Sequence, residues 1–203
     1  KIPEFDGLAF GFPCNDFSVV GEQKGIKGKF GPLYSYGLKA ISEKNPDWFV
    51  AENVTGLESA NSGKIFNVIL KELESVGKGY NITAHKYKFE EYSVPQKRHR
   101  IIIVGLRKDL KKYFLVPKPI ITNSSEYLTA ENALLHPPIS KDTKNCEITR
   151  QSSEVIERLK HIPPGGNAWH EAIPDHLKLN VKGTKLSNIY RRLKCDEPSY
   201  TIT

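Results

Sequence analysis

Short apolar runs alternate with helical stretches along the first half of the chain. The segments GLAFGF (7–12) and WFVAENV (48–54) are apolar enough to predict buried strands. Two further runs, YNITAHKYKF (80–89) and RHRIIIVGLR (98–107), predict two more strands. Because the stretch 101–104 is apolar without interruption, we expect it to be buried on both faces of a sheet.

The stretches between the predicted strands have helical periodicity. Each of two predicted helices gathers four apolar residues on one face, Leu33, Tyr36, Ala40 and Ile41 in the first and Ile65, Val68, Ile69 and Leu73 in the second. Gly77 is expected to end the second helix. Strands that alternate with helices in this way predict an α/β fold, in which crossover helices connect the strands of a sheet.

The pattern changes after Arg107. The sequence becomes rich in lysine and punctuated by proline, and turn markers such as VPKPI and IPPGGN replace the periodicity, apart from one short helical stretch near SSEVIERLKHI. We therefore predict a core at 1–107, an irregular second lobe at 108–188 and a return to the core at 189–203. The final stretch, YRRLKCDEPSYTIT, ends on what we predict to be the start of a strand.

Composition narrows the classes of partner. The chain carries a formal net charge of +7 over 203 residues, which favours a polyanionic partner without identifying one. No apolar run approaches the length of a membrane span, and the first residues lack a signal-peptide pattern. We therefore expect a soluble cytoplasmic protein with no membrane partner. The sequence contains no methionine, so we expect it to be part of a longer polypeptide.

The cysteines argue against a disulfide framework and against a structural metal site. Cys14, Cys146 and Cys195 lie far apart in the sequence, and no cysteine or histidine pair has the spacing of a zinc site. Because the number of cysteines is odd, they cannot all pair in disulfide bonds within one chain. We expect no bound metal and a reducing compartment.

Three stretches carry side chains suited to catalysis. Cys14 follows a proline after the first predicted strand, and Glu52 lies at the exit of the second. In QKRHR, the two-residue period of a strand predicts Gln96, Arg98 and Arg100 on one face. Open α/β folds place their sites at the carboxyl ends of parallel strands, so a thiol, a carboxyl group and two guanidinium groups are predicted to converge.

Each of these residues also has a structural interpretation. An unpaired cysteine is most often a small buried hydrophobe, and a lone glutamate at a strand end is most often solvated or pairs with a helix cap. The arginines are equally compatible with an ion pair to Glu90 or Glu91. Taken singly, the residues leave both interpretations open.

Taken in order, five motifs resemble those of the C5-cytosine DNA methyltransferases: PCNDFS, GPLYSYG, AENV, QKRHRIIIVG and RRLKCDEPSYTIT. The resemblance covers essentially the whole chain. It implies a Rossmann-like methyltransferase core, partial in this chain, with the lobe at 108–188 as a target-recognition region. It further implies methyl transfer from S-adenosylmethionine to C5 of a flipped cytosine in double-stranded DNA, in a bacterial restriction-modification system close to the nucleoid.

The resemblance also assigns catalytic roles. It implies that Cys14 adds to C6 of cytosine and that Glu52 protonates N3. Arg98 and Arg100 are expected to supply a positive field for the thiolate and to hold the base O2 or a neighbouring phosphate. Because Glu52 must carry a proton when it donates one, we expect a desolvated pocket around it.

Further residues match binding positions of the family. Pro13 and Leu33 are expected to line the methionine end of the cofactor pocket, with core packing as the alternative. The residues expected at the DNA come from the loop after the cysteine, the QKRHR segment, the PPGGN turn and the last basic stretch: Ser18, Gln96, Gly165, Gly166, Asn167, Arg191 and Arg192. Lys182 and Lys185 offer additional phosphate contacts.

The chain also departs from the family pattern. Asn15 stands where bacterial members often have glutamine, and neither the glycine-rich cofactor loop nor the motif expected after Thr203 is in the sequence. We therefore expect the missing amino-terminal half or a complementary subunit as a partner. The alternative function is a DNA-recognition module that performs no chemistry without a partner polypeptide. A thiol hydrolase is disfavoured because no histidine follows the expected arrangement around Cys14.

Overall fold

The computed structural model describes residues 2–12, 34–140, 142–144, 146, 149–181, 183 and 186–201. The chain divides into two compact units, one formed by Lys1–Lys88 and His99–Lys118 and the other by Phe89–Arg98 and Pro119–Thr203. The predicted lobe at 108–188 does not coincide with either unit, and its assignment to target recognition stays a prediction. No helix in the described part of the chain is long and apolar enough to cross a membrane.

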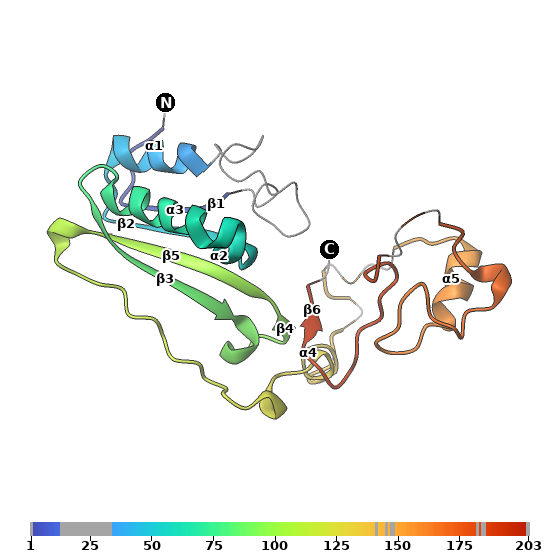
Figure 1. Ribbon diagram of the computed structural model, residues 1–203. Coiled ribbons are helices and arrows are strands. Elements are labelled where there is room, and N and C mark those ends of the chain that lie inside the picture. The colour runs from blue at the N-terminus through green and yellow to red at the C-terminus, as the bar shows by residue number, and fades with distance from the viewer. Residues whose placement is uncertain are drawn as a thin grey trace. The chain divides into compact units, whose positions relative to one another are not determined.

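A four-stranded sheet forms the first unit, with its strands in the order β1-β2-β5-β3 (Figure 1). β1 (Gly7–Gly11) runs parallel to β2 (Trp48–Val54), and α1 (Tyr34–Lys44) lies between them in the sequence. β5 (His99–Arg107) is antiparallel both to β2 and to β3 (Tyr80–Lys88). The four predicted strands are confirmed. The expectation of parallel strands around the site is wrong for β5, whose start rather than its end lies beside the end of β2.

The helices of this unit pack on one side of the sheet. α2 (Gly56–Ser59) and α3 (Lys64–Ser75) follow β2 and lie with α1 on the same side (Figure 1). Together the helices and strands bury the main core, which consists of Phe12, Tyr34, Ile41, Phe49, Ala51, Leu57, Ile65, Ile69, Leu73, Tyr80, Ile101 and Ile103.

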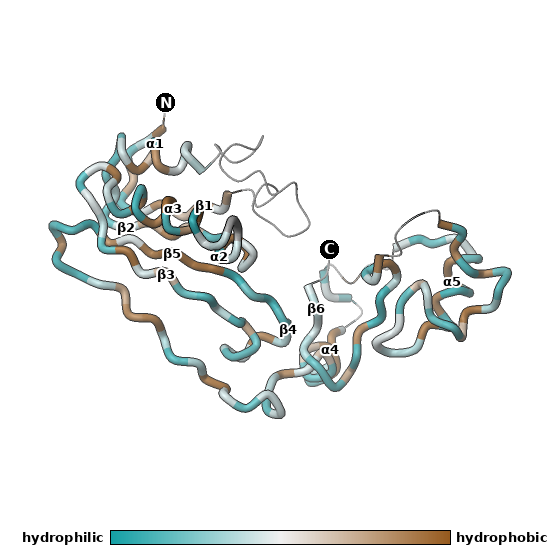
Figure 2. Tube along the Cα trace, in the orientation of Figure 1, coloured by the Kyte–Doolittle hydropathy of each residue, from teal (hydrophilic) through white to brown (hydrophobic). Residues whose placement is uncertain are grey.

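The hydropathy of β5 changes along its length. Figure 2 shows a hydrophilic start that gives way to an apolar middle. Ile101, Ile103 and Val104 are buried, as the apolar run predicts, whereas Ile102 is half-buried. Alternate residues of a strand point to opposite faces, so Val104 lies on the face opposite to Ile101 and Ile103. The burial of Val104 therefore shows that this second face of β5 is also partly covered.

The prediction is wrong for two residues that it assigned to the buried faces of the helices. Tyr36 is 68% exposed, and Tyr34 is buried in its place. Residues seven apart in a helix differ by only about 20° in direction, so Tyr34 and Ile41 share a face that Tyr36 does not. Val68 is 41% exposed, while the residues at four-residue spacing are buried, namely Ile65, Ile69 and Leu73.

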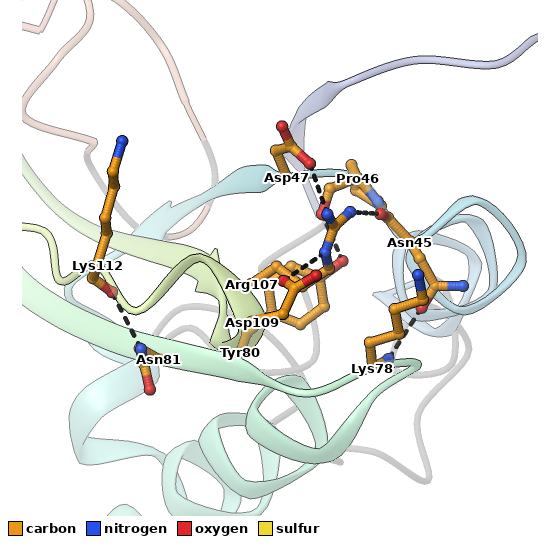
Figure 3. A network of polar contacts seen from close by, with 9 residues as sticks. All are labelled: Asn45, Pro46, Asp47, Lys78, Tyr80, Asn81, Arg107, Asp109 and Lys112. Carbon is orange, nitrogen blue, oxygen red and sulfur yellow. Dashed lines mark hydrogen bonds and ion pairs between the residues drawn. The ribbon is translucent and has the colours of Figure 1, made fainter.

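Arg107, the last residue of β5, joins separate segments of the first unit (Figure 3). Its Nη2 lies 2.9 Å from Asp47 Oδ1, and its Nε lies 2.8 Å from Asp109 Oδ1. Its Nη1 donates to the Asn45 carbonyl oxygen. The hydrogen bond from Arg107 lowers the pKa of Asp109 below its ordinary value. These contacts fix the end of the sheet opposite to Glu52.

Tyr80 closes the core beside this cluster. Its side chain is fully buried, and its hydroxyl donates to the Pro46 carbonyl oxygen at 2.8 Å (Figure 3). Burial raises the pKa of Tyr80 to about 12, against the opposing effect of the Arg107 charge. The hydroxyl therefore stays protonated at neutral pH and remains a donor.

The second unit is largely irregular. β4 (Gln96–Lys97) and β6 (Ser199–Tyr200) form a short parallel pair, and two short helices are α4 (Ala130–Leu135) and α5 (Ser153–Lys160). The strand and helix predicted near 199 and 152–162 are thus confirmed. The 3-10 helices in the described parts of both units are Ala60–Gly63, Phe89–Tyr92, Lys108–Leu110, Ser124–Glu126 and Asp175–Leu177.

A buried arginine stabilises the second unit. Arg158 of α5 is 4% exposed, and its Nε donates to the Leu177 carbonyl oxygen. Its Nη2 pairs with Glu154 Oε1 one helical turn earlier at 2.5 Å, and its guanidinium carbon lies 6.0 Å from the ring centroid of Tyr190. The charge is therefore neutralised and hydrogen-bonded, which a buried guanidinium requires. A small apolar core surrounds this region, formed by Ile162, Ile173 and Leu177.

The QKRHR segment does not form one strand. β4 ends one residue before Arg98, and β5 begins one residue after it. The Arg98 backbone N–H donates to the Gln96 carbonyl oxygen at 2.9 Å, and its carbonyl oxygen accepts from Phe89 N–H at 3.1 Å. The prediction that Gln96, Arg98 and Arg100 share one strand face is therefore wrong, because a two-residue period does not continue across a break.

Candidate functional site

Glu52 and Arg100 form an ion pair at one end of the four-stranded sheet. Arg100 Nε lies 2.7 Å from Glu52 Oε1. Arg100 Nη1 donates to the His99 carbonyl oxygen at 2.8 Å, which holds the guanidinium group close to its own strand. The Arg100 side chain is 17% exposed and the Glu52 side chain is 40% exposed. The carboxyl group is thus more accessible to water than the desolvated pocket expected from the sequence.

The register of the strands explains the contact. β5 pairs with β2 so that Arg100 lies opposite Val54, and Ile102 lies opposite Glu52. Glu52 and Arg100 are therefore diagonal neighbours on one face of an antiparallel pair, a separation that long side chains bridge. On the other side of β2, Gly11 pairs with Glu52, and a Cβ atom at Gly11 would lie 3.4 Å from Glu52 Oε2.

Asn53 connects the ends of β1 and β2. Its side chain is 2% exposed, and its Nδ2 donates to the Phe12 carbonyl oxygen at 3.2 Å. Its Oδ1 accepts from the Val54 N–H at 2.8 Å. Sequence reasoning missed this residue. The available signal was its position, because Asn53 follows Phe49 and Ala51 on the core-facing side of β2, where a polar side chain needs a buried partner.

Six residues with a predicted role lie outside the described residues. They are Pro13, Cys14, Ser18 and Leu33, together with the predicted phosphate contacts Lys182 and Lys185. Sequence neighbours of Pro13 and Leu33 are described, since Phe12 precedes Pro13 and Tyr34 follows Leu33. The rings of Phe12 and Tyr34 pack against each other with their centroids 6.0 Å apart.

In the second unit, the PPGGN turn pairs with the basic stretch that begins at Tyr190. The Gly165 N–H donates to the Arg192 carbonyl oxygen at 3.1 Å, and the Arg192 N–H donates to the Gly166 carbonyl oxygen at 2.9 Å. Gly165 has a φ of +80°, a conformation that favours glycine. The predicted glycines and the predicted arginines are thus brought side by side.

The side chains of this region also have local partners. The Asn167 side chain accepts from the Trp169 N–H at 3.0 Å and donates to the Ser187 carbonyl oxygen at 3.2 Å. Arg192 Nη1 donates to the Ile162 carbonyl oxygen at 2.8 Å. The guanidinium carbon of Arg191 lies 4.3 Å from the ring centroid of Tyr200.

The remaining predicted residues, Gln96 and Arg98, belong to the second unit, whereas Glu52 and Arg100 belong to the first. Gln96 pairs with Ser199 in the β4–β6 ladder. The sequence prediction grouped the three QKRHR residues, and the structure distributes them between two units.

Comparison with known proteins decides the family. Residues 1–200 match the family model of the C-5 cytosine-specific DNA methylases. The chain belongs to this family. This methylase chain is 57% identical over 204 residues to the Type II methyltransferase M.BbvI of Brevibacillus brevis, a match that covers 100% of the chain and 54% of the relative.

A second relative of the methylase chain is the Type II methyltransferase M.NgoFVII of Neisseria gonorrhoeae. It is 39% identical over 206 residues, which cover 99% of this chain and 53% of the relative. The methylase chain therefore spans about half the length of these curated relatives.

A solved structure supports the fold. A crystal structure described as a DNA modification methyltransferase encoded within a prophage of Escherichia coli matches with a TM-score of 0.50 and 23% identity. The match covers 86% of this chain and 47% of that one. The methylase chain thus has the Rossmann-like α/β fold of methyltransferases, as the resemblance implied.

Proposed function

We propose that the methylase chain is part of a DNA (cytosine-5-)-methyltransferase of a bacterial restriction-modification system. The enzyme transfers a methyl group to C5 of a cytosine in double-stranded DNA. The observation that carries the proposal is the Glu52–Arg100 pair, 2.7 Å apart at the end of the sheet, in a chain of the cytosine-specific family. β1 of the same sheet ends three residues before Cys14 in the sequence.

The reaction needs a nucleophile and an acid, because C5 of cytosine is a poor nucleophile. The Cys14 thiolate adds to C6, and Glu52 gives a proton to N3, so that C5 becomes part of an electron-rich enamine. C5 then takes the methyl group, whose bond to the sulfur of its donor breaks. Loss of the C5 proton to solvent and of the Cys14 thiolate, with return of the N3 proton to Glu52, restores the aromatic ring.

Arg100 positions the acid in this scheme. Its Nε holds one oxygen of Glu52 and leaves the second oxygen for the base. As an ion pair, Glu52 is a carboxylate and must gain a proton before it gives one to N3. Arg98 is assigned to the base O2 or to a neighbouring phosphate.

S-adenosylmethionine, the cofactor that the family implies, supplies the methyl group. Pro13 and Leu33 are proposed to line its methionine end. The packing of Phe12 against Tyr34, with centroids 6.0 Å apart, supports this assignment, because each ring belongs to the sequence neighbour of one proposed residue.

The DNA contacts follow from the need to expose the base. Cys14 cannot reach C6 in a stacked duplex, so the cytosine is flipped out, and Ser18 is proposed to hold its backbone. In the second unit, the main-chain ladder between Gly165, Gly166 and Arg192 supports a DNA-facing surface made from the turn and the basic stretch. The net charge of +7 favours such a partner.

Bisulfite sequencing tests the proposal. Full-length protein is incubated with S-adenosylmethionine and unmethylated plasmid DNA, and we expect 5-methylcytosine at one recurring sequence. Cys14→Ser is expected to leave less than about 1% of the activity, because a serine hydroxyl is hardly ionised at neutral pH, and to retain duplex binding. Duplex binding without any modified cytosine would instead support a recognition module that depends on a partner.

A further inference from the structure

Glu197 pairs with two lysines in the second unit. Its Oε2 lies 2.9 Å from Lys97 Nζ, and its Oε1 lies 2.6 Å from Lys194 Nζ. The lysines come from distant parts of the sequence, Lys97 from β4 and Lys194 from the stretch before β6. Each oxygen of one carboxylate thus holds a different ammonium group.

The three side chains border a small cavity of about 120 Å³. Its charged lining consists of Lys97, Arg191, Arg192, Lys194 and Glu197, four cations and one anion. The remaining wall includes Gly165, where an added Cβ atom would lie 3.0 Å from Lys194 Cγ and Cε. The stem of Lys194 therefore rests against the bare backbone of Gly165, and a larger residue at this position would require the Lys194 side chain to shift.

The lysines remain accessible. The side chains of Lys97 and Lys194 are 47% and 53% exposed, and that of Glu197 is 39% exposed. Hydrogen bonds from Lys194 and Lys97 lower the pKa of Glu197 to about 2, so the carboxylate is ionised at neutral pH. The two ammonium groups are therefore directed at one half-exposed anion.

The arrangement has the geometry of a site for a second kind of anion. Two ammonium groups that reach two oxygens of a carboxylate also reach two oxygens of a phosphodiester. The site keeps a surplus of positive charge, because Glu197 neutralises only part of the four lining cations. The negative charge of Asp196, the residue before Glu197 in the sequence, also contributes to raising the pKa of Lys194.

We propose that a backbone phosphate of DNA binds between Lys97 and Lys194 and takes the place of the Glu197 carboxylate. This inference rests on the proposed function, since it presupposes a DNA substrate. Glu197 holds the lysines ready in the free protein and competes with the phosphate, so it limits affinity for any duplex. Displacement of one anion by another releases fewer counterions than binding to free lysines, and the salt dependence of binding is reduced accordingly.

The chain provides a matched control. Lys178 pairs with Asp175 at 2.6 Å three residues away, as Lys194 pairs with Glu197, and Lys178 is 52% exposed. This control pair belongs to the same unit but lies outside the lining of the cavity. Glu197→Gln is therefore compared with Asp175→Asn, and Lys194→Gln with Lys178→Gln.

Duplex binding by the full-length protein is measured by fluorescence anisotropy at several salt concentrations. We expect Glu197→Gln to bind a duplex about three- to tenfold more tightly than wild type, with a salt slope steeper by about 0.9. Adding Lys194→Gln to this variant is expected to reverse both changes. Neither control substitution is expected to change the dissociation constant more than about twofold.

A Glu197→Gln variant that is folded by circular dichroism and binds no more tightly than Asp175→Asn overturns the proposal. If Glu197→Gln fails to fold, duplex binding by Lys97→Gln and Lys194→Gln tests the proposal instead. Each is expected to bind a duplex about threefold more weakly than Lys178→Gln, and equal binding would overturn the phosphate site. A wild-type protein that binds no duplex overturns the proposed function as well. A wild type that methylates DNA, beside variants that match their controls, overturns the phosphate site alone.

Discussion

Substitution of Asn53 by alanine tests how the end of β1 is held before Cys14. The change removes the donor that bonds to the Phe12 carbonyl oxygen at 3.2 Å and the acceptor for the Val54 N–H at 2.8 Å. The carbonyl oxygen of Phe12 loses a buried side-chain partner, because Asn53 is only 2% exposed.

The magnitude follows from these contacts. A typical hydrogen bond contributes about 1 kcal/mol, and a buried group left without a partner costs about 1–3 kcal/mol. We therefore expect Asn53→Ala to lower the free energy of unfolding by about 1–3 kcal/mol. Misplacement of a nucleophile by about 1 Å reduces a rate by up to about a hundredfold, so we expect methyl transfer to slow by about ten- to a hundredfold. Duplex affinity should change by less than about twofold, because Asn53 is assigned no DNA contact.

Urea denaturation and single-turnover methyl transfer measure the two effects. Asn81→Ala is the matched control, because the Asn81 side chain also donates to a backbone carbonyl oxygen, that of Lys112 at 3.0 Å, but at an exposed position. The control is expected to change stability by less than about 0.5 kcal/mol and to leave the rate unchanged. If Asn53→Ala lost stability but transferred methyl groups at the wild-type rate, its role in positioning Cys14 would be refuted.

Three further predictions concern other contacts. Arg100→Met removes the partner of Glu52. We expect it to lower the free energy of unfolding by about 1 kcal/mol and to slow methyl transfer at least about tenfold. Full activity of this variant would contradict the positioning role of Arg100. Tyr80→Phe should lower the free energy of unfolding by about 1 kcal/mol. The pKa of Tyr80 rises from 10.0 to about 12 on folding, so its contribution is complete below pH 10 and is lost as pH rises towards 12. Urea denaturation at about pH 8 and about pH 11 should show a steeper alkaline loss for wild type than for Tyr80→Phe, and equal losses would contradict the burial argument. Arg191→Ala should weaken binding to all duplexes alike and reduce the salt slope by about 0.9. Arg192→Ala should also lower the melting temperature, because its guanidinium donates to a carbonyl oxygen at 2.8 Å. A changed sequence preference with an unchanged salt slope would assign these arginines to base readout.

Much of the first unit was predictable from short-range patterns. Apolar runs marked all four strands of the sheet, and helical periodicity marked α1 and α3. The direction of β5 was not predictable, because an apolar strand has the same sequence pattern in parallel and antiparallel sheets. That direction matters for the site, since it places Arg100 rather than Arg107 beside the end of β2.

The second unit was harder to predict because its contacts are non-local and made by backbone atoms. The ladder between Gly165, Gly166 and Arg192 links residues more than twenty positions apart without any periodic signal. The break at Arg98 was equally hidden, because it follows from the pairing of β4 with β6 about a hundred residues later. Glu197 was overlooked for the same reason, since one of its lysines lies in β4.

Some site assignments depended on chemistry that propensity does not encode. The proximity of Glu52 and Arg100 follows from strand register, whereas their proposed roles come from the family motifs. Asn53 carried a usable signal, because it is a polar residue at a core-facing position of an apolar strand, but it is not one of the charged residues on which the site prediction rested. The assignments of Cys14, Pro13, Ser18 and Leu33 lie outside the described residues and stay predictions.

Covalent trapping tests the central claim most directly. Full-length protein is mixed with S-adenosylmethionine and a duplex containing 5-fluorocytosine at the methylated position. Fluorine cannot leave C5 as a cation, so an enzyme that has added its thiolate to C6 and methylated C5 remains bonded to the DNA. Mass spectrometry of the digested complex is predicted to find the modified base on the peptide containing Cys14. Efficient methylation of ordinary cytosine without a covalent complex, or an adduct on another residue, would contradict the account.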